Sequence, residues 1–148
     1  MQGRKETLEL LRRESVKIIE QADDWKDAIR ISVRPLEDQG AVEVRYKEEI
    51  IANIENMGSY IVIAPFVALP HARPEQGVLE SQIAVTLLKK PVIFDDKKDP
   101  VKLLIALAAA DNNRHLDALA KISEILQDEE KTKEIMEAKD QDVLYSYF

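Results

Sequence analysis

His71 and His115, the only histidines among the 148 residues, are the strongest candidates for chemistry in the sequence. His71 lies between Pro70 and Pro74, and a proline restricts both its own backbone and that of the residue before it. The two prolines therefore predict a stiff loop, which can present a neutral imidazole at a fixed place as a nucleophile. A histidine in a mostly apolar loop can also be purely structural, and the pattern alone leaves both interpretations open.

His115 lies close to a predicted helix start. The preceding Asp111, Asn112 and Asn113 are residue types that favour helix N-caps, and an amphipathic pattern continues to Leu126. A helix N-terminus favours anions, so His115 and the neighbouring backbone N–H groups could face a phosphoryl group. The simpler alternative is a solvated or capping residue. The sequence separation of the two histidines gives no information about their distance in space.

Other kinds of reactive site lack support in the sequence. The four glycines form no phosphate-binding loop, and no serine-hydrolase elbow occurs. The absence of cysteine excludes disulfides, cysteine-bound zinc and thiol catalysis, and the two histidines do not have the spacing of a metal site. We therefore expect neither a cofactor nor a bound metal.

Length and charge define the class of protein. A chain of 148 residues with 45% hydrophobic residues is expected to form one domain spanning residues 1–148. A net charge of −7 argues against binding to nucleic acid or to an anionic membrane surface, and it favours basic partners. No apolar run reaches the roughly 20 residues of a membrane span, and no signal peptide is apparent. We expect a cytoplasmic protein with no direct membrane insertion.

Periodicity predicts an α/β fold, a single-domain sandwich with a small central mixed sheet flanked by helices. The expected helices are a short one before Ser15 built on Leu8, Leu10 and Leu11, one from Asp24 through Leu36, one over 44–57 ended by Gly58, one over 111–126, and one or two more at the end of the chain. The expected strands are 16–19, a buried strand at 60–64 ended by Pro65, 81–88 and 101–109, although the leucine and alanine content of 101–109 would also allow a helix. Residues 65–74 are expected to be non-helical, and 91–100 to be a polar turn.

The segment 60–74, Tyr-Ile-Val-Ile-Ala-Pro-Phe-Val-Ala-Leu-Pro-His-Ala-Arg-Pro, resembles the enzyme IIA components of the bacterial sugar phosphotransferase system. Within them it is similar to the mannitol/fructose-type superfamily and its ascorbate/pentitol-like branch. Two further blocks agree: residues 24–30 with Gly40 and Tyr46, and residues 103–116. The resemblance covers nearly the whole chain, and the Pro-His block is its most specific part.

The resemblance implies a phosphotransferase that works through a phosphohistidine. Such a carrier takes a phosphoryl group from phosphorylated HPr and passes it to a cognate enzyme IIB, in transient complexes. The group then reaches a sugar that enters through the membrane permease IIC, a partner met only indirectly. By their motifs, His71 would carry the phosphoryl group on Nε2, and His115 would be the second active-site histidine. No cofactor is implied, because the donor protein brings the reactive group.

Two positions depart from the family pattern. Mannitol-type relatives carry an arginine late in the helix before the motif strand, whereas this chain has none at 54–57. Arg73, inside the motif, is the candidate to supply that positive charge beside the phosphoryl group. Phe66 stands where relatives usually have glycine, and phenylalanine avoids positive φ, so the turn is expected either to change shape or to expose Phe66 for docking.

Two other functions compete with transport. The same phosphorylatable domain could regulate other proteins rather than supply a permease. The chain could also be a binding scaffold that is never phosphorylated. We favour the transport role from the sequence, which contains no DNA-binding segment.

Overall fold

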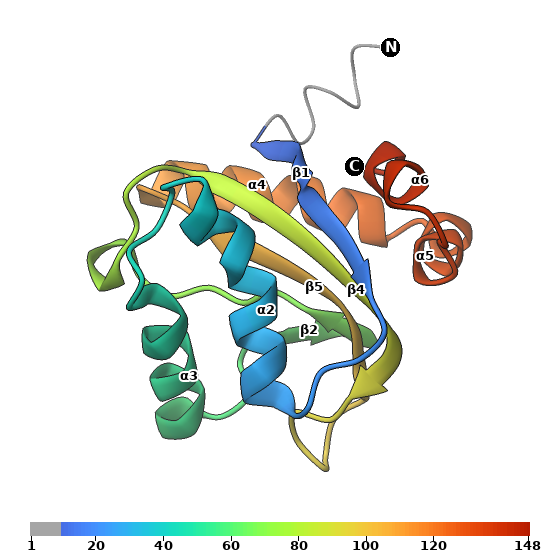
Figure 1. The fold of residues 1–148 in the computed structure, drawn as a ribbon, viewed down its shortest axis with the longest axis horizontal. Coiled ribbons are helices and arrows are strands. Elements are labelled where there is room, and N and C mark those ends of the chain that lie inside the picture. The colour runs from blue at the N-terminus through green and yellow to red at the C-terminus, as the bar shows by residue number, and fades with distance from the viewer. Residues whose placement is uncertain (1–9) are drawn as a thin grey trace.

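A computed structural model describes residues 10–148. Within this range the chain forms a mixed five-stranded sheet with helices on both faces (Figure 1). The strands are β1 (Leu11–Ile19), β2 (Val62–Ala64), β3 (Phe66–Ala68), β4 (Gln82–Val92) and β5 (Val101–Ala108). The helices are α2 (Trp25–Asp38), α3 (Tyr46–Met57), α4 (Asn112–Leu126), α5 (Glu129–Met136) and α6 (Gln141–Ser146), with a short 3-10 turn at Pro74–Gln76. The expected α/β sandwich is confirmed.

The sheet has the strand order β1-β4-β5-β3-β2. β1 runs parallel to β4 and β3 parallel to β5, whereas β4–β5 and β2–β3 are antiparallel. The sheet is therefore mixed, as expected. β4 and β5 pair in the middle, with Val85 opposite Ile105. Their nearly continuous apolar sequences suit strands that are covered on both faces.

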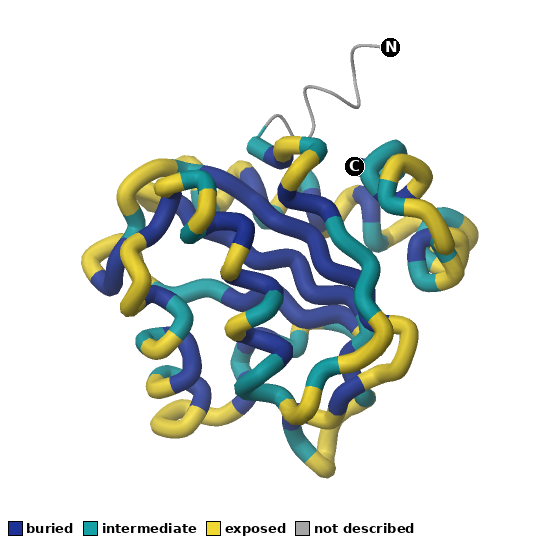
Figure 2. Tube along the Cα trace, in the orientation of Figure 1, coloured by how far each residue is buried: buried dark blue, intermediate teal, exposed yellow. Residues whose placement is uncertain are grey.

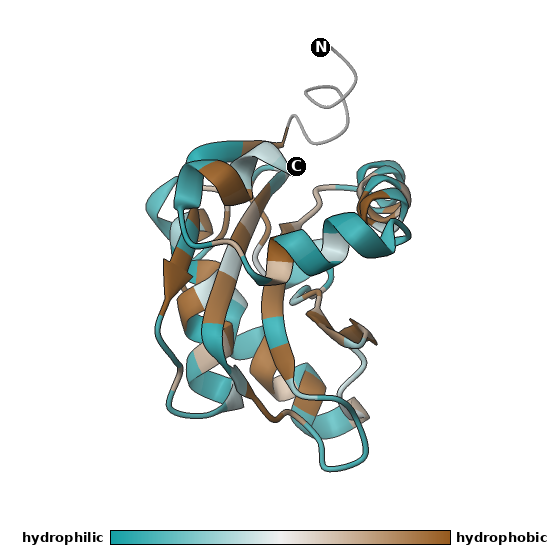
Figure 3. Cartoon of the chain, turned by 90° about the vertical axis from the view of Figure 1, so that its right-hand side faces the viewer, coloured by the Kyte–Doolittle hydropathy of each residue, from teal (hydrophilic) through white to brown (hydrophobic). Residues whose placement is uncertain are grey.

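Each face of the sheet has its own core (Figure 2). Leu104 of β5 points to the side of α2 and α3, where it joins the cluster that contains Ile29 and Ile50. The neighbouring Ile105 points to the opposite side, where it joins the cluster that contains Ile122 of α4. This alternation follows from the two-residue repeat of a strand. Figure 3 shows the apolar strands enclosed by helices whose outer surfaces are hydrophilic.

The helix ends follow the expected local signals. The Asp24 side chain accepts a hydrogen bond from the Asp27 N–H at 2.8 Å and caps α2. Gly58 ends α3 with a φ of 88°, and its N–H donates to Ile54 O at 2.8 Å. Asp111 caps α4 by accepting from the Arg114 N–H at 2.8 Å. The caps at Gly58 and Asp111 fix where α3 ends and where α4 begins.

The helix expected before Ser15 is wrong over residues 10–14, the part of it that the structure describes. Residues Leu11–Ile19 form one strand, in which Ser15 is buried, whereas Leu8 lies outside the described residues. Two or three leucines cannot stabilise an isolated helical turn, because nucleation is costly and the backbone finds its partners in β4 instead. The strand expected at 16–19 is confirmed as the second half of β1.

The strand expected at 60–64 is shorter and less buried than predicted. Only Val62–Ala64 is strand, and Ile63 is exposed because β2 is an edge of the sheet. Pro65 turns the chain rather than ending the sheet, and β3 follows at once inside the segment 65–74, which was expected only to be non-helical. β4 likewise continues to Val92, beyond the predicted end at residue 88.

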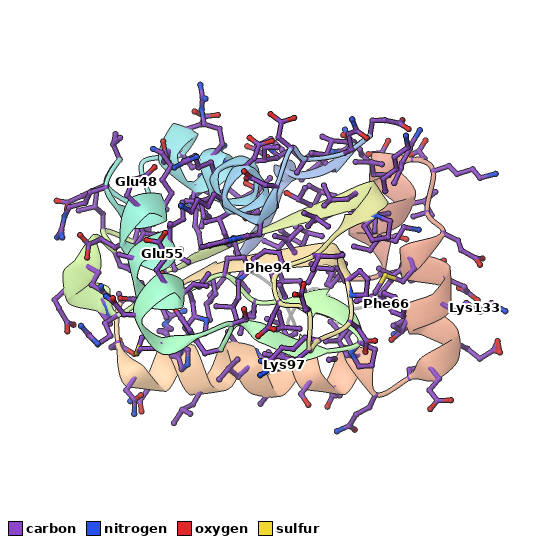
Figure 4. The ribbon with its side chains drawn as sticks, turned by 90° about the horizontal axis from the view of Figure 1, so that it is seen from below. Glu48, Glu55, Phe66, Phe94, Lys97 and Lys133 are labelled. Carbon is purple, nitrogen blue, oxygen red and sulfur yellow. The ribbon has the colours of Figure 1, made fainter. Side chains whose placement is uncertain are left out.

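Phe66 has a left-handed backbone, with φ 68°, in the tight turn that joins β2 to β3. A proline followed by a residue at positive φ is typical of a type II turn, whose third position normally holds glycine. The turn therefore keeps the positive-φ backbone that normally requires glycine, although position 66 holds phenylalanine. Phe66 is also 43% exposed. Its ring lines a groove beside Lys133 of α5, and both residues are labelled in Figure 4.

Because of this strain, we expect glycine to give a more stable protein than alanine at position 66, the reverse of their usual order of stability. Phe66→Gly should be more stable than Phe66→Ala by about 1 kcal/mol, because only glycine adopts positive φ without a steric penalty. Both variants lose the same ring, so their difference isolates the backbone. Urea unfolding measures it, and an alanine variant at least as stable as the glycine variant would contradict a strained turn.

Candidate functional site

The two histidines lie together at one cavity, although 44 positions separate them in the sequence. Their ring centroids are 5.3 Å apart, and the ring planes are tilted by 44°. The cavity has a volume of about 330 Å³. Its lining residues come from α3, the α3–β2 connection, the loop after β3, the end of β5 and the start of α4: Asn53, Met57, Tyr60, His71, Ala72, Arg73, Pro74, Leu107, Ala109, Asp111, Asn112 and His115.

The loop that carries His71 is anchored on both sides. The N–H of Leu69 donates to Ile61 O at 2.7 Å, and the N–H of Leu107 on β5 donates to Pro70 O at 2.9 Å. The two residues before His71 are thus tied to the sheet, and the prolines restrict the chain around it. The predicted stiff loop is present at the end of β3.

Tyr46 of α3 holds the same loop from below. Its side chain is fully buried, and its hydroxyl donates to Leu107 O at 2.8 Å and accepts from the Ala72 N–H at 3.0 Å. Burial raises the pKa of Tyr46 to about 12, so the hydroxyl keeps its proton at neutral pH. α3, β5 and the loop are therefore joined at one buried hydroxyl directly beneath the cavity.

The His71 ring is held in one tautomer. Its Nδ1 lies 2.6 Å from Leu69 O, and because a carbonyl only accepts, Nδ1 carries the proton. Nε2 is left unprotonated, with its lone pair available. Burial lowers the pKa of His71, the hydrogen bond to Leu69 raises it, and His115 lowers it. The resulting neutral ring with a free Nε2 is the form required of a nucleophile.

The lowered pKa of His71 predicts its pH response. The ring should titrate below the ordinary value of 6.5, so nucleophilic activity should persist into mildly acidic solution. The unfolded chain binds this proton at higher pH than the folded chain, so His71 should reduce stability as pH falls from 6.5 through its folded pKa. NMR titration of the ring protons measures the midpoint, and a midpoint above 6.5 would contradict the effect of burial.

Arg73 reaches the same cavity, but from its rim. Its side chain is exposed, and its Nε lies 2.9 Å from Glu75 Oε2. The structure thus brings all three expected residues, His71, His115 and Arg73, to one place. The positive charge of Arg73 is solvated and partly neutralised by Glu75, so it is less well fixed than either imidazole.

Four polar cavity residues lie outside the site predicted from the sequence: Asn53, Tyr60, Asp111 and Asn112. In the sequence, Tyr60 opens the 60–74 motif but indicates only a buried strand. Asn53 is a polar residue next to the apolar stripe of α3, directly before the segment where relatives carry an arginine. Asp111 and Asn112 indicate only a helix-cap cluster. A signal was therefore present for each residue, but it did not indicate that the residue reaches the cavity.

Metal binding and membrane crossing find no support in residues 10–148. No group of three or more histidine, cysteine, aspartate or glutamate side chains there could hold a metal ion. Across the same residues, no helix combines the length and the apolar character needed to cross a bilayer.

Comparison with known proteins places the chain in a family. Residues 9–148 match the family described as "Phosphoenolpyruvate-dependent sugar phosphotransferase system, EIIA 2". The mannitol-specific cryptic phosphotransferase enzyme IIA component of Escherichia coli K12 is 40% identical over 124 residues, which cover 84% of each chain. The ascorbate-specific PTS system EIIA component of the same organism is 39% identical over 123 residues, 82% of this chain and 80% of the relative.

A solved structure agrees in fold. The solution structure of the mannitol-specific cryptic enzyme IIA from Escherichia coli superposes with a TM-score of 0.88 at 36% identity, covering 94% of this chain and 95% of that one. The match over residues 9–148 and the two relatives near 40% identity confirm the resemblance seen in the 60–74 motif. The chain therefore belongs to the EIIA 2 family of the phosphoenolpyruvate-dependent sugar phosphotransferase system, and it is a phosphotransferase component of that system.

Proposed function

We propose that this protein is a phosphoryl carrier in the cytoplasm. It accepts a phosphoryl group from phosphorylated HPr on Nε2 of His71 and passes it to a cognate enzyme IIB during sugar uptake. The observation that carries the proposal is the 2.6 Å hydrogen bond from His71 Nδ1 to Leu69 O, which leaves Nε2 as the free nitrogen beside His115.

In the acceptance step, the lone pair of His71 Nε2 attacks the phosphorus atom, the bond from phosphorus to the donor histidine breaks, and the electron pair returns to the donor ring. In the transfer to enzyme IIB, a nucleophile of that protein attacks the phosphorus atom, the bond from phosphorus to Nε2 breaks, and the electron pair returns to the His71 ring. The transition state is loose, so positioning and charge stabilisation supply most of the catalysis.

Two side chains are proposed to stabilise the transferred charge. A bound phosphoryl group adds about two negative charges at neutral pH. His115, whose ring lies 5.3 Å from that of His71, takes up a proton and faces this charge, and Arg73 approaches it from the rim. An exposed cation contributes less than a partly buried one, because water screens it. His115 is therefore the stronger partner of the two.

The proposed sugar is ascorbate or a pentitol-like sugar. One relative near 40% identity is named for ascorbate and another for mannitol, so the names of relatives leave more than one sugar class in view. The 60–74 motif favours the ascorbate/pentitol-like branch. The sugar itself meets enzymes IIB and IIC rather than this chain. The assignment is tested by measuring uptake of ascorbate and of pentitols in cells that lack the chain, where uptake of the assigned sugar should be lost.

Incubation with enzyme I, HPr and phosphoenolpyruvate tests the carrier role. We expect a mass gain of one phosphoryl group that is lost in acid, maps to His71, and moves on to enzyme IIB when that protein is added. Omission of HPr should prevent the gain. A chain that stays unlabelled with active enzyme I and HPr would overturn the proposal.

Arg73→Ala should lower the rate of phosphoryl acceptance about three- to tenfold, an effect of roughly 1 kcal/mol for an exposed charge. Because exposed charges are screened by salt, the loss should shrink at high ionic strength. Stopped reactions with phosphorylated HPr at low and high salt measure the effect. Glu75→Ala, which frees Arg73 from its partner, should not slow transfer. An Arg73→Ala rate equal to that of wild type at low salt would remove Arg73 from the site.

A further inference from the structure

Tyr60 contacts His71 in two ways that the transfer chemistry described above does not use. Its hydroxyl donates to the main-chain O of His71 at 2.5 Å. Its ring meets the imidazole edge to face, with centroids 5.3 Å apart and planes at 82°. The ring contact restricts rotation of the imidazole, and the hydroxyl fixes the backbone from which the imidazole projects.

Behind Tyr60 lies a buried amide whose orientation is unambiguous. Gln76 is 8% exposed, and its Oε1 accepts from the Arg73 N–H at 2.9 Å. Its Nε2 donates to Glu49 Oε1 at 3.0 Å. Because a backbone N–H only donates and a carboxylate only accepts, the two ends of the Gln76 amide cannot be exchanged.

The orientation of Gln76 determines that of Asn53. The Asn53 Nδ2 donates to Gln76 Oε1 at 3.0 Å, and Asn53 Oδ1 accepts from Gln76 Nε2 at 3.2 Å. The Asn53 side chain is also a hydrogen-bond partner of the Tyr60 hydroxyl, and both residues line the cavity. Burial raises the pKa of Tyr60, and this hydrogen bond lowers it.

Because a carbonyl only accepts, the single proton of the Tyr60 hydroxyl lies on its bond to the His71 carbonyl, and Asn53 must therefore be the donor to that hydroxyl. The two hydrogen bonds therefore point in the same direction: Asn53 of α3 donates to the Tyr60 hydroxyl, and this hydroxyl donates to the His71 carbonyl. We propose that Tyr60 is a positioning residue for phosphoryl transfer on His71, and that Asn53 sets the direction of its hydroxyl. The inference rests on the proposed function and adds two residues to it.

The first test removes the hydroxyl and keeps the ring. Tyr60→Phe should lower kcat for acceptance from phosphorylated HPr about tenfold, with KM changed less than about twofold, because misorientation of a reacting group affects the chemical step. Tyr60→Leu, which also removes the ring contact, should lower kcat further. Tyr147→Phe is the matched control: it deletes a tyrosine hydroxyl that bonds Glu134 at the other end of the molecule, and kcat should not change.

The second test reverses the direction of the hydrogen bond between Asn53 and Tyr60. Asn53→Asp replaces the donor amide by an acceptor of the same shape, which draws the Tyr60 proton away from His71. Its kcat should fall as in Tyr60→Phe, and the double variant should be no slower than either single variant. Asn56→Asp adds the same charge to an exposed position one turn along α3 and should leave kcat unchanged.

NMR of the His71 ring nitrogens separates positioning from simple loss of stability. In wild type the ring should be almost entirely the Nδ1–H tautomer, and Tyr60→Phe and Asn53→Asp should shift or broaden its signals while the Tyr147→Phe spectrum stays as in wild type. If wild type is labelled on His71 and Tyr60→Phe retains its kcat and ring signals, the inference is overturned and the carrier function stands. If wild type takes no label, both are overturned.

Discussion

His71→Gln will leave the protein unable to accept a phosphoryl group. Glutamine keeps a side-chain N–H that can reach Leu69 O, but it has no nucleophilic nitrogen. Labelling from phosphorylated HPr should fall to background, a loss of about 10³-fold or more, because the substituted side chain cannot form the covalent bond to phosphorus. The measurement is the acid-labile mass gain after incubation with enzyme I, HPr and phosphoenolpyruvate.

The fold provides the control for this loss. His71 is only partly buried, and Tyr46, Leu69 and Pro70 tie its loop to the sheet without the imidazole. His71→Gln should therefore unfold in urea within about 1 kcal/mol of wild type, as expected for a substitution outside the core. Label that appears on His115 in this variant, or undiminished label on the whole chain, would show that the nucleophile has been wrongly assigned.

The site could be predicted from the sequence where the chemistry is local. Pro70, His71 and Pro74 sit within five positions, and their backbone restrictions describe a rigid loop without any distant information. His115 could be placed at a helix start from Asp111 and its neighbours, but not opposite His71. The approach of His115 to His71 depends on α4 packing against one face of the sheet while the His71 loop leaves the end of the inner strand β3, and this arrangement is a property of the whole topology.

The roles of Tyr60 and Asn53 could not be predicted from the sequence for a related reason. In the sequence, Tyr60 reads as the first residue of an apolar strand and Asn53 as the polar interruption of a helix stripe. Each acquires a role only through a partner more than ten positions away, namely His71 for Tyr60 and Gln76 for Asn53. Hydrogen bonds between side chains and distant backbone leave no periodic trace, so pattern reasoning finds the nucleophile but misses the residues that hold it.

Strand prediction failed where the sheet ends rather than where it is buried. The central strands β4 and β5 were found because long apolar runs suit strands covered on both faces. The edge strand β1 mixes Arg12, Arg13 and Glu14 with apolar residues, because one side of its backbone is unpaired and the chain is partly exposed. The short β2–β3 hairpin was hidden by Pro65 and Phe66, a residue pair that rarely forms a tight turn.

His115→Ala tests the electrostatic half of the mechanism, and it should slow phosphoryl acceptance about 10- to 100-fold. At ~5 Å, the separation of the two rings, a positive charge and a negative charge attract by about 3 kcal/mol at an effective dielectric of 20. Desolvation and partial screening reduce this gain to about 1.4–2.8 kcal/mol, which corresponds to the expected range of rates. Single-turnover transfer from phosphorylated HPr measures it, and the label should still map to His71.

His115→Gln separates charge from hydrogen bonding, because it retains an N–H donor but cannot become a cation. If positive charge is what stabilises the phosphoryl group, the glutamine variant should be nearly as slow as the alanine variant; recovery of the wild-type rate would assign His115 to hydrogen bonding alone. Arg114→Ala removes an exposed cation one residue away that does not line the cavity, and its kcat should match wild type. If His115, whose ring centroid lies 5.3 Å from that of His71, proved dispensable for transfer, the cavity would stabilise the phosphoryl charge through Arg73 and neutral donors only.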